Sequence, residues 1–212
     1  MKTILLLRPE GLNAADAAFF ESRGYDQQIV TPISSLRLRS IGTEDCKAIQ
    51  AADWIFFTSQ TPVKSVLAVS SSKVKIAVIG RKTAREVEES GCKVDFISPV
   101  ETKEDFVAAW RQQYQLPQKI VYPKSNLAGS FPLQAHEFIA YDNLPNRSSF
   151  EKISVLLKNQ EIDAVYLTSP SNWQRFYQIY QDFSWQSLTL IALGNTTYKA
   201  IEDTGCQVLL KA

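Results

Sequence analysis

The chain has 212 residues, of which 45% are hydrophobic and 21% are charged, so it has enough apolar material for one large domain or two small ones. Its formal net charge is +1, with acids and bases interleaved, and gives no global field of the kind that marks nucleic-acid or membrane binders. The three cysteines, Cys46, Cys92 and Cys206, form no CxxC pair, which argues against a disulfide framework or a zinc site and fits a reducing compartment.

The amino-terminal stretch MKTILLLRPEG contains an apolar run of four residues, 4–7, which ends at Arg8. This run is too short for the core of a signal peptide and far too short to span a bilayer. We therefore expect a cytoplasmic protein that does not contact a membrane.

Short apolar runs alternate with segments of helical spacing along the chain. The expected strands are 4–7, 54–57, 76–79, 120–122, 165–167 and 190–193. The expected helices between them include 14–23, 82–90, 105–114 and 196–204. Nearly continuous apolar strands are typical of sheets buried on both faces, so the alternation predicts an α/β architecture with parallel sheets.

Landmarks of the first half recur in the same order in the second half. ILLLRPEG is answered by IVYPKSN, DWIFFTSQ by DAVYLTSP, and IAVIGRKTAREVEESGCKV by LIALGNTTYKAIEDTGCQV. The first strand of each copy ends at a cation, Arg8 or Lys124. The recurrence predicts an internal duplication that gives two similar parallel-sheet domains, flavodoxin-like or Rossmann-like in type.

Hydroxyl side chains follow the expected strands at their carboxyl ends. They are Thr58, Ser59, Thr83, Ser169 and Thr197. This edge of a parallel α/β sheet binds ligands, and hydroxyls beside the N–H groups of a following helix suit a carboxylate or phosphate. Each residue could equally be a helix cap, because Ser and Thr are preferred at that position. The matched recurrence favours a ligand-binding role.

Standard catalytic signatures are missing from the sequence. A P-loop, a GxGxxG after a strand and a GxSxG elbow are all absent, so nucleotide cofactors and ordinary serine hydrolysis have no local support. The single histidine, His136, excludes a His-rich metal site. An enzyme with this sequence would use hydroxyls, cations and shape.

Taken in order, the landmarks resemble the uroporphyrinogen III synthase family. They are a strand ending in Arg-Pro, then FTS, then IAVIG followed by TA, then a lone tyrosine after a middle strand, then TSPSN, and a final GxxTxxAIxxxG. The resemblance runs over nearly the whole chain, from Ile4 to Val208, and the ordered set carries it because each piece alone is weak.

The resemblance implies two α/β domains joined by a two-stranded linker, with one domain built from both ends of the chain. Carried over here, the first domain would comprise 1–31 and 147–212, and the second would comprise 41–140. The linker strands would be 32–40 and 141–146.

The resemblance also implies a reaction. The family cyclises hydroxymethylbilane, a linear polycarboxylate tetrapyrrole, with loss of water and inversion of the last pyrrole ring through a spiro intermediate, as a step of tetrapyrrole and haem biosynthesis. It implies neither a metal nor an organic cofactor, and no nucleic-acid partner. We expect a monomer, with transient contact to the preceding enzyme of the pathway.

Matched residue by residue, the family pattern implies several site residues. The substrate-binding positions are Arg8, Thr58, Ser59, Thr83, Ser169 and Thr197, with Lys124 and Lys64 as further carboxylate partners. Tyr141, in FIAYDN, stands where the family places its tyrosine and is the candidate catalytic residue, because a phenol can protonate or hydrogen-bond the leaving hydroxyl. The other interpretation of Tyr141 is an amphipathic linker tyrosine.

One segment departs from the family pattern, and two other functions stay open. After Lys124 the family usually has a longer helix, whereas SNLAGSFPLQAHE is interrupted by Gly129 and Pro132 and predicts a short or irregular helix. A two-lobed binding protein for a small polyanionic ligand would use the same duplicated plan without catalysis. A member of the fold that has lost or changed its activity is the other alternative.

Overall fold

The computed structural model describes most of the chain. The described ranges are 1–8, 14–100, 102–115, 118–183 and 187–211. Pro9, the second residue of the Arg-Pro motif, lies outside them.

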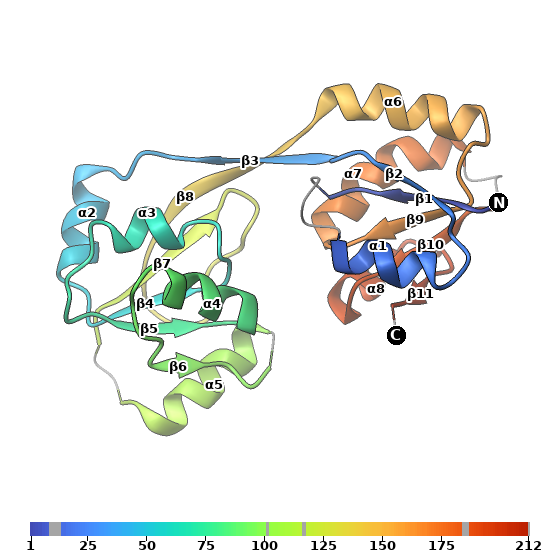
Figure 1. Cartoon of the computed structure of the whole chain (residues 1–212). Coiled ribbons are helices and arrows are strands. Elements are labelled where there is room, and N and C mark those ends of the chain that lie inside the picture. The colour runs from blue at the N-terminus through green and yellow to red at the C-terminus, as the bar shows by residue number, and fades with distance from the viewer. Residues whose placement is uncertain (9–13, 101, 116–117, 184–186, 212) are drawn as a thin grey trace. The chain divides into compact units, whose positions relative to one another are not determined.

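The chain divides into two compact units. Unit 1 comprises Met1–Ser35 and Leu144–Ala212, and unit 2 comprises Leu36–Asn143. Each unit is a sheet with helices packed on it (Figure 1). Each therefore has a core of its own.

The sheet of unit 1 has five strands, and all of its neighbouring strands are parallel. They are β1 (Thr3–Leu6), β2 (Gln27–Val30), β9 (Ala164–Leu167), β10 (Thr189–Ala192) and β11 (Leu209–Leu210). Their spatial order is β11-β10-β9-β1-β2. Counted along the unit this is the doubly wound order 2-1-3-4-5.

Helices cover both faces of this sheet. They are α1 (Ala14–Glu21), α6 (Arg147–Lys158), α7 (Pro170–Tyr180) and α8 (Asn195–Glu202), and a 3₁₀ turn at Gln181–Phe183 follows α7. Leu5 and Val165 point toward α6, α7 and α8, whereas Ile4 and Tyr166 pack with Phe20 of α1. This explains why the strands read as continuous apolar runs, because successive residues enter cores on opposite faces.

The main sheet of unit 2 also has five parallel strands, in the order β8-β7-β4-β5-β6. They are β4 (Trp54–Phe57), β5 (Lys75–Val78), β6 (Phe96–Ile97), β7 (Ile120–Ser125) and β8 (His136–Pro145). Strand β3 (Ser34–Leu38) lies next to β8. The boundary between the units falls inside both β3 and β8.

The helices of unit 2 are α2 (Thr43–Gln50), α3 (Val63–Leu67), α4 (Arg81–Glu89) and α5 (Lys103–Gln113). The first three cover one face of the sheet, where Ile55 and Phe57 are buried. On the other face Phe56 packs against Phe106 and Trp110 of α5 and against Phe131. Residues 126–135, between β7 and β8, contain no helix, so this segment is irregular and the short helix that the sequence allowed there is absent.

The predicted α/β class with parallel sheets is confirmed. All six predicted strands are present, as β1, β4, β5, β7, β9 and β10. The signal was clear because each is apolar on both faces, whereas β6 and β11 have only two residues each and leave no periodicity to detect.

Candidate functional site

Each unit has a point where the strand order reverses, and in open α/β sheets ligands bind outside the carboxyl ends of the strands at such a point. In unit 1 it lies between β1 and β9, and in unit 2 it lies between β7 and β4. The predicted site residues divide between the two units. Arg8, Ser169 and Thr197 belong to unit 1, and Thr58, Ser59, Thr83, Lys124, Lys64 and Tyr141 belong to unit 2.

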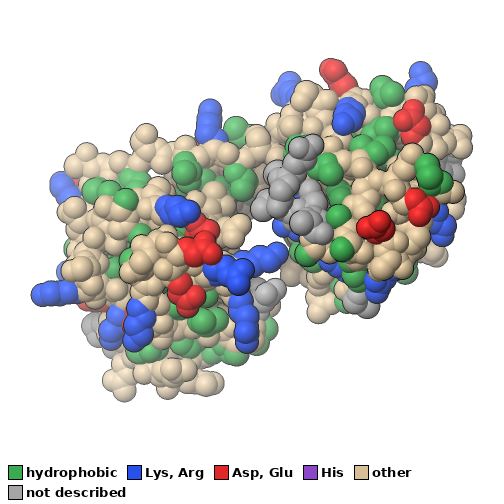
Figure 2. Space-filling view, viewed as in Figure 1, with side chains coloured by type: hydrophobic (Ala, Val, Ile, Leu, Met, Phe, Trp, Pro, Cys, Tyr) green, Lys and Arg blue, Asp and Glu red, His purple; other side chains and the backbone are tan. Residues whose placement is uncertain are grey.

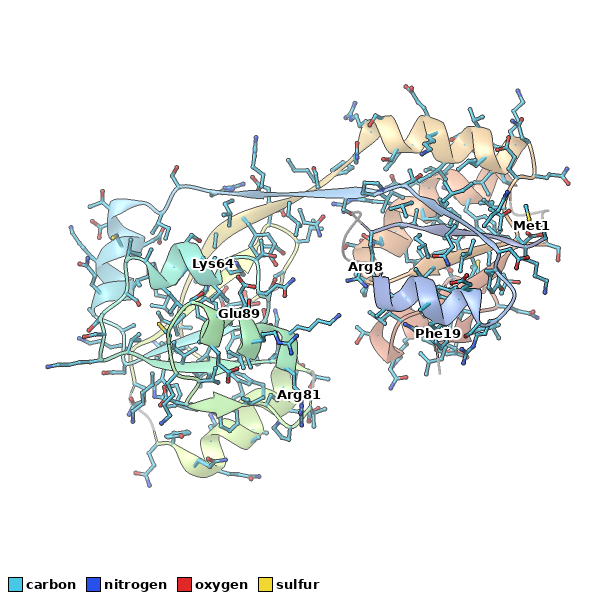
Figure 3. All side chains as sticks on the ribbon, viewed as in Figure 1. Met1, Arg8, Phe19, Lys64, Arg81 and Glu89 are labelled. Carbon is cyan, nitrogen blue, oxygen red and sulfur yellow. The ribbon has the colours of Figure 1, made fainter. Side chains whose placement is uncertain are left out.

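Arg8 follows β1 and is held by a buried carboxylate. Its Nη1 donates to Asp16 Oδ2 at 2.7 Å, and the two side chains are 17% and 8% exposed. Asp16 Oδ1 also accepts from the hydroxyl of Tyr166 at 3.2 Å and from Nζ of Lys211. Burial, together with the charge of Asp16, raises the pKa of Tyr166. The ion pair with Asp16 thus holds the side chain of Arg8 in place at the sheet edge (Figure 3).

Sequence reasoning missed this network. Asp16 lies in α1, among alanines and phenylalanines, and only 6% of it is exposed. An acid flanked on both sides by alanines within this helix is the signal that could have indicated a buried partner. Lys211 is 195 residues away from Asp16 along the chain, and nothing local connects them.

Ser169 and Thr197 lie at the starts of the helices that follow β9 and β10. Ser169 is the N-cap of α7, and its Oγ accepts from the backbone N–H of Asn172 at 3.2 Å. The capping interpretation is therefore correct for Ser169, whose Oγ also lies 3.1 Å from Ser171 Oγ. Thr197 is buried in the first turn of α8, and its N–H donates to Gly194 O at 3.1 Å.

In unit 2 the hydroxyl residues occupy the corresponding places. Thr58 Oγ1 and Tyr122 OH are 3.3 Å apart. Ser59 Oγ accepts from the backbone N–H of Thr61 at 3.3 Å. Thr83 is buried in the first turn of α4, so only 5% of it is exposed.

The glycines before Thr83 and Thr197 differ between the two copies. Gly80 has φ +79°, in the left-handed region that favours glycine. Gly194 has φ −156°, an extended conformation that any residue adopts. The segments that lead into Thr83 and Thr197 are therefore alike in sequence but differ in backbone geometry at the glycine.

Both candidate lysines already have carboxylate partners. Lys124 Nζ is 2.6 Å from Glu137 Oε2. Burial raises the pKa of Glu137, but hydrogen bonds from Lys124 and from the backbone N–H of Phe131 outweigh it, so the pKa lies below its usual value. Lys64 Nζ is 3.0 Å from Glu86, and this hydrogen bond raises the pKa of Lys64, whose side chain is 70% exposed.

Figure 2 shows Lys and Arg side chains close to acidic ones on unit 2. Arg81, Lys82 and Arg85 are exposed along the first turns of α4. In Figure 3 Glu89 of this helix lies near Lys64 of α3. Cations at a helix N-terminus are disfavoured by the macrodipole, so this surface would gain from an anionic ligand.

Tyr141 lies in β8, where only 8% of it is exposed, and it belongs to the core cluster that includes Phe138 and Ala140. An irregularity in the β7–β8 pairing, between Lys124 and Ser125, sets Tyr141 opposite Ser125. Its carbonyl accepts from the N–H of Asn126 at 3.2 Å. Tyr141 is therefore held against the carboxyl end of β7.

The residue after Tyr141 is a buried acid that fastens β3 to β8. Asp142 Oδ1 accepts from Arg39 Nη2 at 2.7 Å and from Arg39 Nε at 3.0 Å, and Oδ2 accepts from Arg37 Nη2 at 3.2 Å. The hydrogen bonds from Arg39 lower the pKa of Asp142 although burial opposes them, and Arg37 adds to the effect.

Two cavities lie away from these edges. One, of about 1050 Å³, is lined in unit 1 by residues that include Tyr180, Tyr198 and Cys206. The other, of about 660 Å³, is lined by residues near the amino ends of β7 and β8, including Lys119 and His136. We place the candidate site at the sheet edges, because neither cavity includes a hydroxyl edge or a strand reversal.

Within the described ranges, no three His, Cys, Asp or Glu side chains gather in a way that could hold a metal ion. In the same part of the chain, no helix has the length and apolar character needed to cross a membrane.

Comparison with known proteins gives consistent matches. Residues 17–212 match the family described as uroporphyrinogen-III synthase HemD. A uroporphyrinogen-III synthase from Chlorobaculum parvum is 23% identical over 229 aligned positions, which cover 98% of this chain and 92% of the relative.

Solved structures match over similar lengths. A mutant uroporphyrinogen III synthase from the extremely thermophilic bacterium Thermus thermophilus superposes with a TM-score of 0.68 at 15% identity, covering 100% of this chain and 93% of that one. A uroporphyrinogen-III synthetase from Helicobacter pylori gives a TM-score of 0.63 at 12% identity, covering 99% and 92%. At these identities the structural matches establish the fold.

Proposed function

The chain belongs to the uroporphyrinogen-III synthase family, and we propose that it performs this family's reaction on hydroxymethylbilane. The resemblance predicted from the ordered motifs is thereby confirmed. The single observation that carries the function is the family match over residues 17–212. The enzyme is a lyase of tetrapyrrole and haem biosynthesis, and the alternative of a non-catalytic binding protein is not favoured.

The reaction closes a linear tetrapyrrole with loss of water and turns over the last pyrrole ring through a spiro intermediate. Closure without an enzyme gives the unturned isomer, so the protein must assist departure of the hydroxyl and hold the chain in one conformation. This task is one of positioning, which hydrogen-bond donors at fixed sheet edges can perform. In keeping with what the family resemblance implies, the proposed mechanism uses neither a metal nor an organic cofactor.

We assign substrate binding to the carboxyl edges of both sheets. The proposed contacts are Arg8, Ser169 and Thr197 in unit 1, and Thr58, Ser59, Thr83, Lys64 and Lys124 in unit 2. Their support is the chemistry of the substrate, whose carboxylates suit hydroxyls, cations and the N–H groups of helix starts. The partners Asp16, Glu86 and Glu137 orient the three cations without removing their capacity to donate to a second carboxylate.

We propose Tyr141 as the group that hydrogen-bonds or protonates the leaving hydroxyl. It is supported by the pairing that sets Tyr141 opposite Ser125, one residue beyond Lys124, at the carboxyl end of β7. A buried phenol loses competing water, which strengthens its hydrogen bond to a departing oxygen.

The architecture suggests an origin by duplication. When the strands of unit 2 are counted from β7, their order is 2-1-3-4-5, the same as in unit 1. Each unit would then take two strands from one copy and three from the other. We propose domains of 1–31 with 147–212 and of 41–140, with β3 and the end of β8 as the linker strands at 32–40 and 141–146.

The proposed setting is cytoplasmic, and the proposed active form is a monomer. Its partner is the small-molecule substrate, with transient contact to the enzyme that supplies hydroxymethylbilane. Such contact would limit spontaneous closure of this unstable compound.

The test is a coupled assay in which hydroxymethylbilane is generated in situ and the oxidised products are separated into type I and type III isomers. We expect the native chain to give mainly type III. Tyr141→Phe should lower kcat by at least a factor of about 100, the lower range for loss of a positioned general acid.

Tyr114→Phe is the matched control, because Tyr114 lies in unit 2 and packs on Trp54 at the amino end of β4. It should keep native activity. Exclusive formation of type I by the native chain would exclude the proposed function and favour binding of another polyanion. A native kcat in Tyr141→Phe would contradict only the proposed role of Tyr141 as an acid and would leave the proposed function standing.

A further inference from the structure

A chain of hydrogen bonds in unit 1 links β3 to the hydroxyl edge of β9. Arg175 Nη1 donates to Ser34 Oγ, and Ser34 Oγ donates to Asn172 Oδ1 at 2.9 Å. Asn172 Nδ2 then donates to Thr168 Oγ1 at 3.3 Å. Both Asn172 and Arg175 are more than nine-tenths buried.

The direction of every donation in this chain is set by Arg175. A guanidinium can only donate, so Ser34 must accept from it and has its single hydrogen left for Asn172. That hydrogen points at Oδ1 and fixes which end of the amide is oxygen, so Nδ2 faces Thr168. Thr168 in turn accepts, and its own hydrogen is directed to another partner.

The hydroxyl of Thr168, which ends this series of hydrogen bonds, lies at the proposed site. Thr168 directly follows β9 and precedes Ser169, at the point where the strand order of unit 1 reverses. A hydroxyl that already accepts a hydrogen bond is polarised toward donation, and a carboxylate is the acceptor that gains most from it. The buried guanidinium at the other end has a pKa lowered by burial, as expected for a cation with restricted hydration.

We propose that Asn172 is a positioning residue for the reaction, because it orients Thr168 to donate to a substrate carboxylate, with Ser34 and Arg175 fixing its amide. This inference rests on the proposed function. It adds Thr168 as a binding residue and gives β3 a role in ordering the site.

The test compares two adjacent serines of β3. Ser34→Ala breaks the chain and frees the amide of Asn172, whereas Ser35→Ala removes an exposed hydroxyl beside it. In the isomer assay Ser34→Ala should raise KM about tenfold, the effect of one misdirected hydrogen bond to a charged group, with kcat within about twofold of native. Ser35→Ala should have the native KM and kcat. Ser34→Thr, which keeps a hydroxyl at this position, should also have the native KM.

A double-mutant cycle separates positioning from a general structural effect. Asn172→Leu and Thr168→Val should each raise KM about tenfold, but Asn172→Leu should add less than about twofold in the Thr168→Val background, because the amide acts through that hydroxyl. Additive effects, or a native KM in Thr168→Val, would overturn the proposal. Should Asn172→Leu fail to fold, Asn172→Asp replaces it, since a carboxylate can accept from Ser34 but cannot donate to Thr168.

The native enzyme and Ser35→Ala show whether type III is formed at all. Failure there counts against the proposed function. If the native enzyme forms type III but the KM effects of Asn172→Leu and Thr168→Val are additive, only the positioning role of Asn172 is contradicted.

Discussion

At the scale of single residues, a buried acid in each unit holds neighbouring cationic side chains in place. Asp16 in unit 1 and Asp142 in unit 2 are almost fully buried, and each accepts hydrogen bonds from two cationic side chains. A buried carboxylate is costly unless it is paired in this way. Both acids therefore hold residues of the proposed site in place, Arg8 in one unit and the strand of Tyr141 in the other.

The lowered pKa of Asp142 predicts a pH dependence of stability. A group whose folded pKa is depressed contributes stability above its unfolded pKa, about 3.9 for Asp, and loses it as the pH falls through the folded value. Asp142→Asn should therefore unfold at lower urea than the native chain at about pH 7. The difference should shrink below about pH 4.

Asp26→Asn, at an exposed position, is the control and should follow the native curve at both pH values. The effect of Asp142→Asn should be modest, because the side chains of Arg37 and Arg39 are 71% and 48% exposed and partly screened by solvent. A difference that stays constant from neutral to acidic pH would mean that shape rather than charge is responsible.

At the scale of elements, the starts of helices have two tasks. Thr102 caps α5 by accepting from the N–H of Asp105 at 3.1 Å, and Ser169 caps α7 in the same way. Thr102 lies on an exposed turn, whereas Ser169 lies at the strand reversal of unit 1. Substitutions at Thr102 and Ser169 can therefore distinguish the effect of a lost cap from the effect of lost substrate binding.

Thr102→Ala and Ser169→Ala should each lower the free energy of unfolding by about 1 kcal/mol, the usual value for loss of a cap. Only Ser169→Ala should also raise KM, because we propose that the hydroxyl of Ser169 contacts a substrate carboxylate. Urea titrations and the isomer assay measure the two effects. Equal KM values in both variants would reduce Ser169 to a structural cap.

At the scale of the whole molecule, the chain has separate cores in its two units. Ile153 of α6 belongs to a cluster of unit 1, and Ile55 of β4 belongs to a cluster of unit 2. Both side chains are fully buried. Because neither cluster contains residues of the other unit, damage to one should not spread by packing to the other.

Ile153→Ala should cost about 3 kcal/mol through lost burial and a residual cavity. Native-state hydrogen exchange should show faster exchange in β1, β9 and β10 while β4, β5 and β7 keep their protection. Ile55→Ala should give the reverse pattern. Loss of protection throughout the chain in either variant would mean that the units unfold as one.

The parts of this molecule that were predictable are those encoded locally. The strands were visible because both faces are apolar, and the hydroxyl edges because each follows such a run. The contacts of the edges were not predictable, since Arg175 and Ser34 are 141 residues apart and no local pattern joins them. The order of the strands in each sheet was likewise invisible to periodicity, because periodicity reports burial but not which strand lies alongside.

The discontinuity of unit 1 has a consequence for how the protein is made. Residues 36–143 are contiguous, so unit 2 can complete its sheet as soon as that stretch has left the ribosome. Strand β1, in contrast, lies between β2 and β9, and Ala164, the first residue of β9, comes 158 residues after Leu6, the last residue of β1 (164 − 6 = 158). A two-strand fragment is marginal in water, so the apolar β1 remains without a stable sheet through most of translation. We therefore expect the sheet of unit 1 to form only after β9 and β10 have been synthesised.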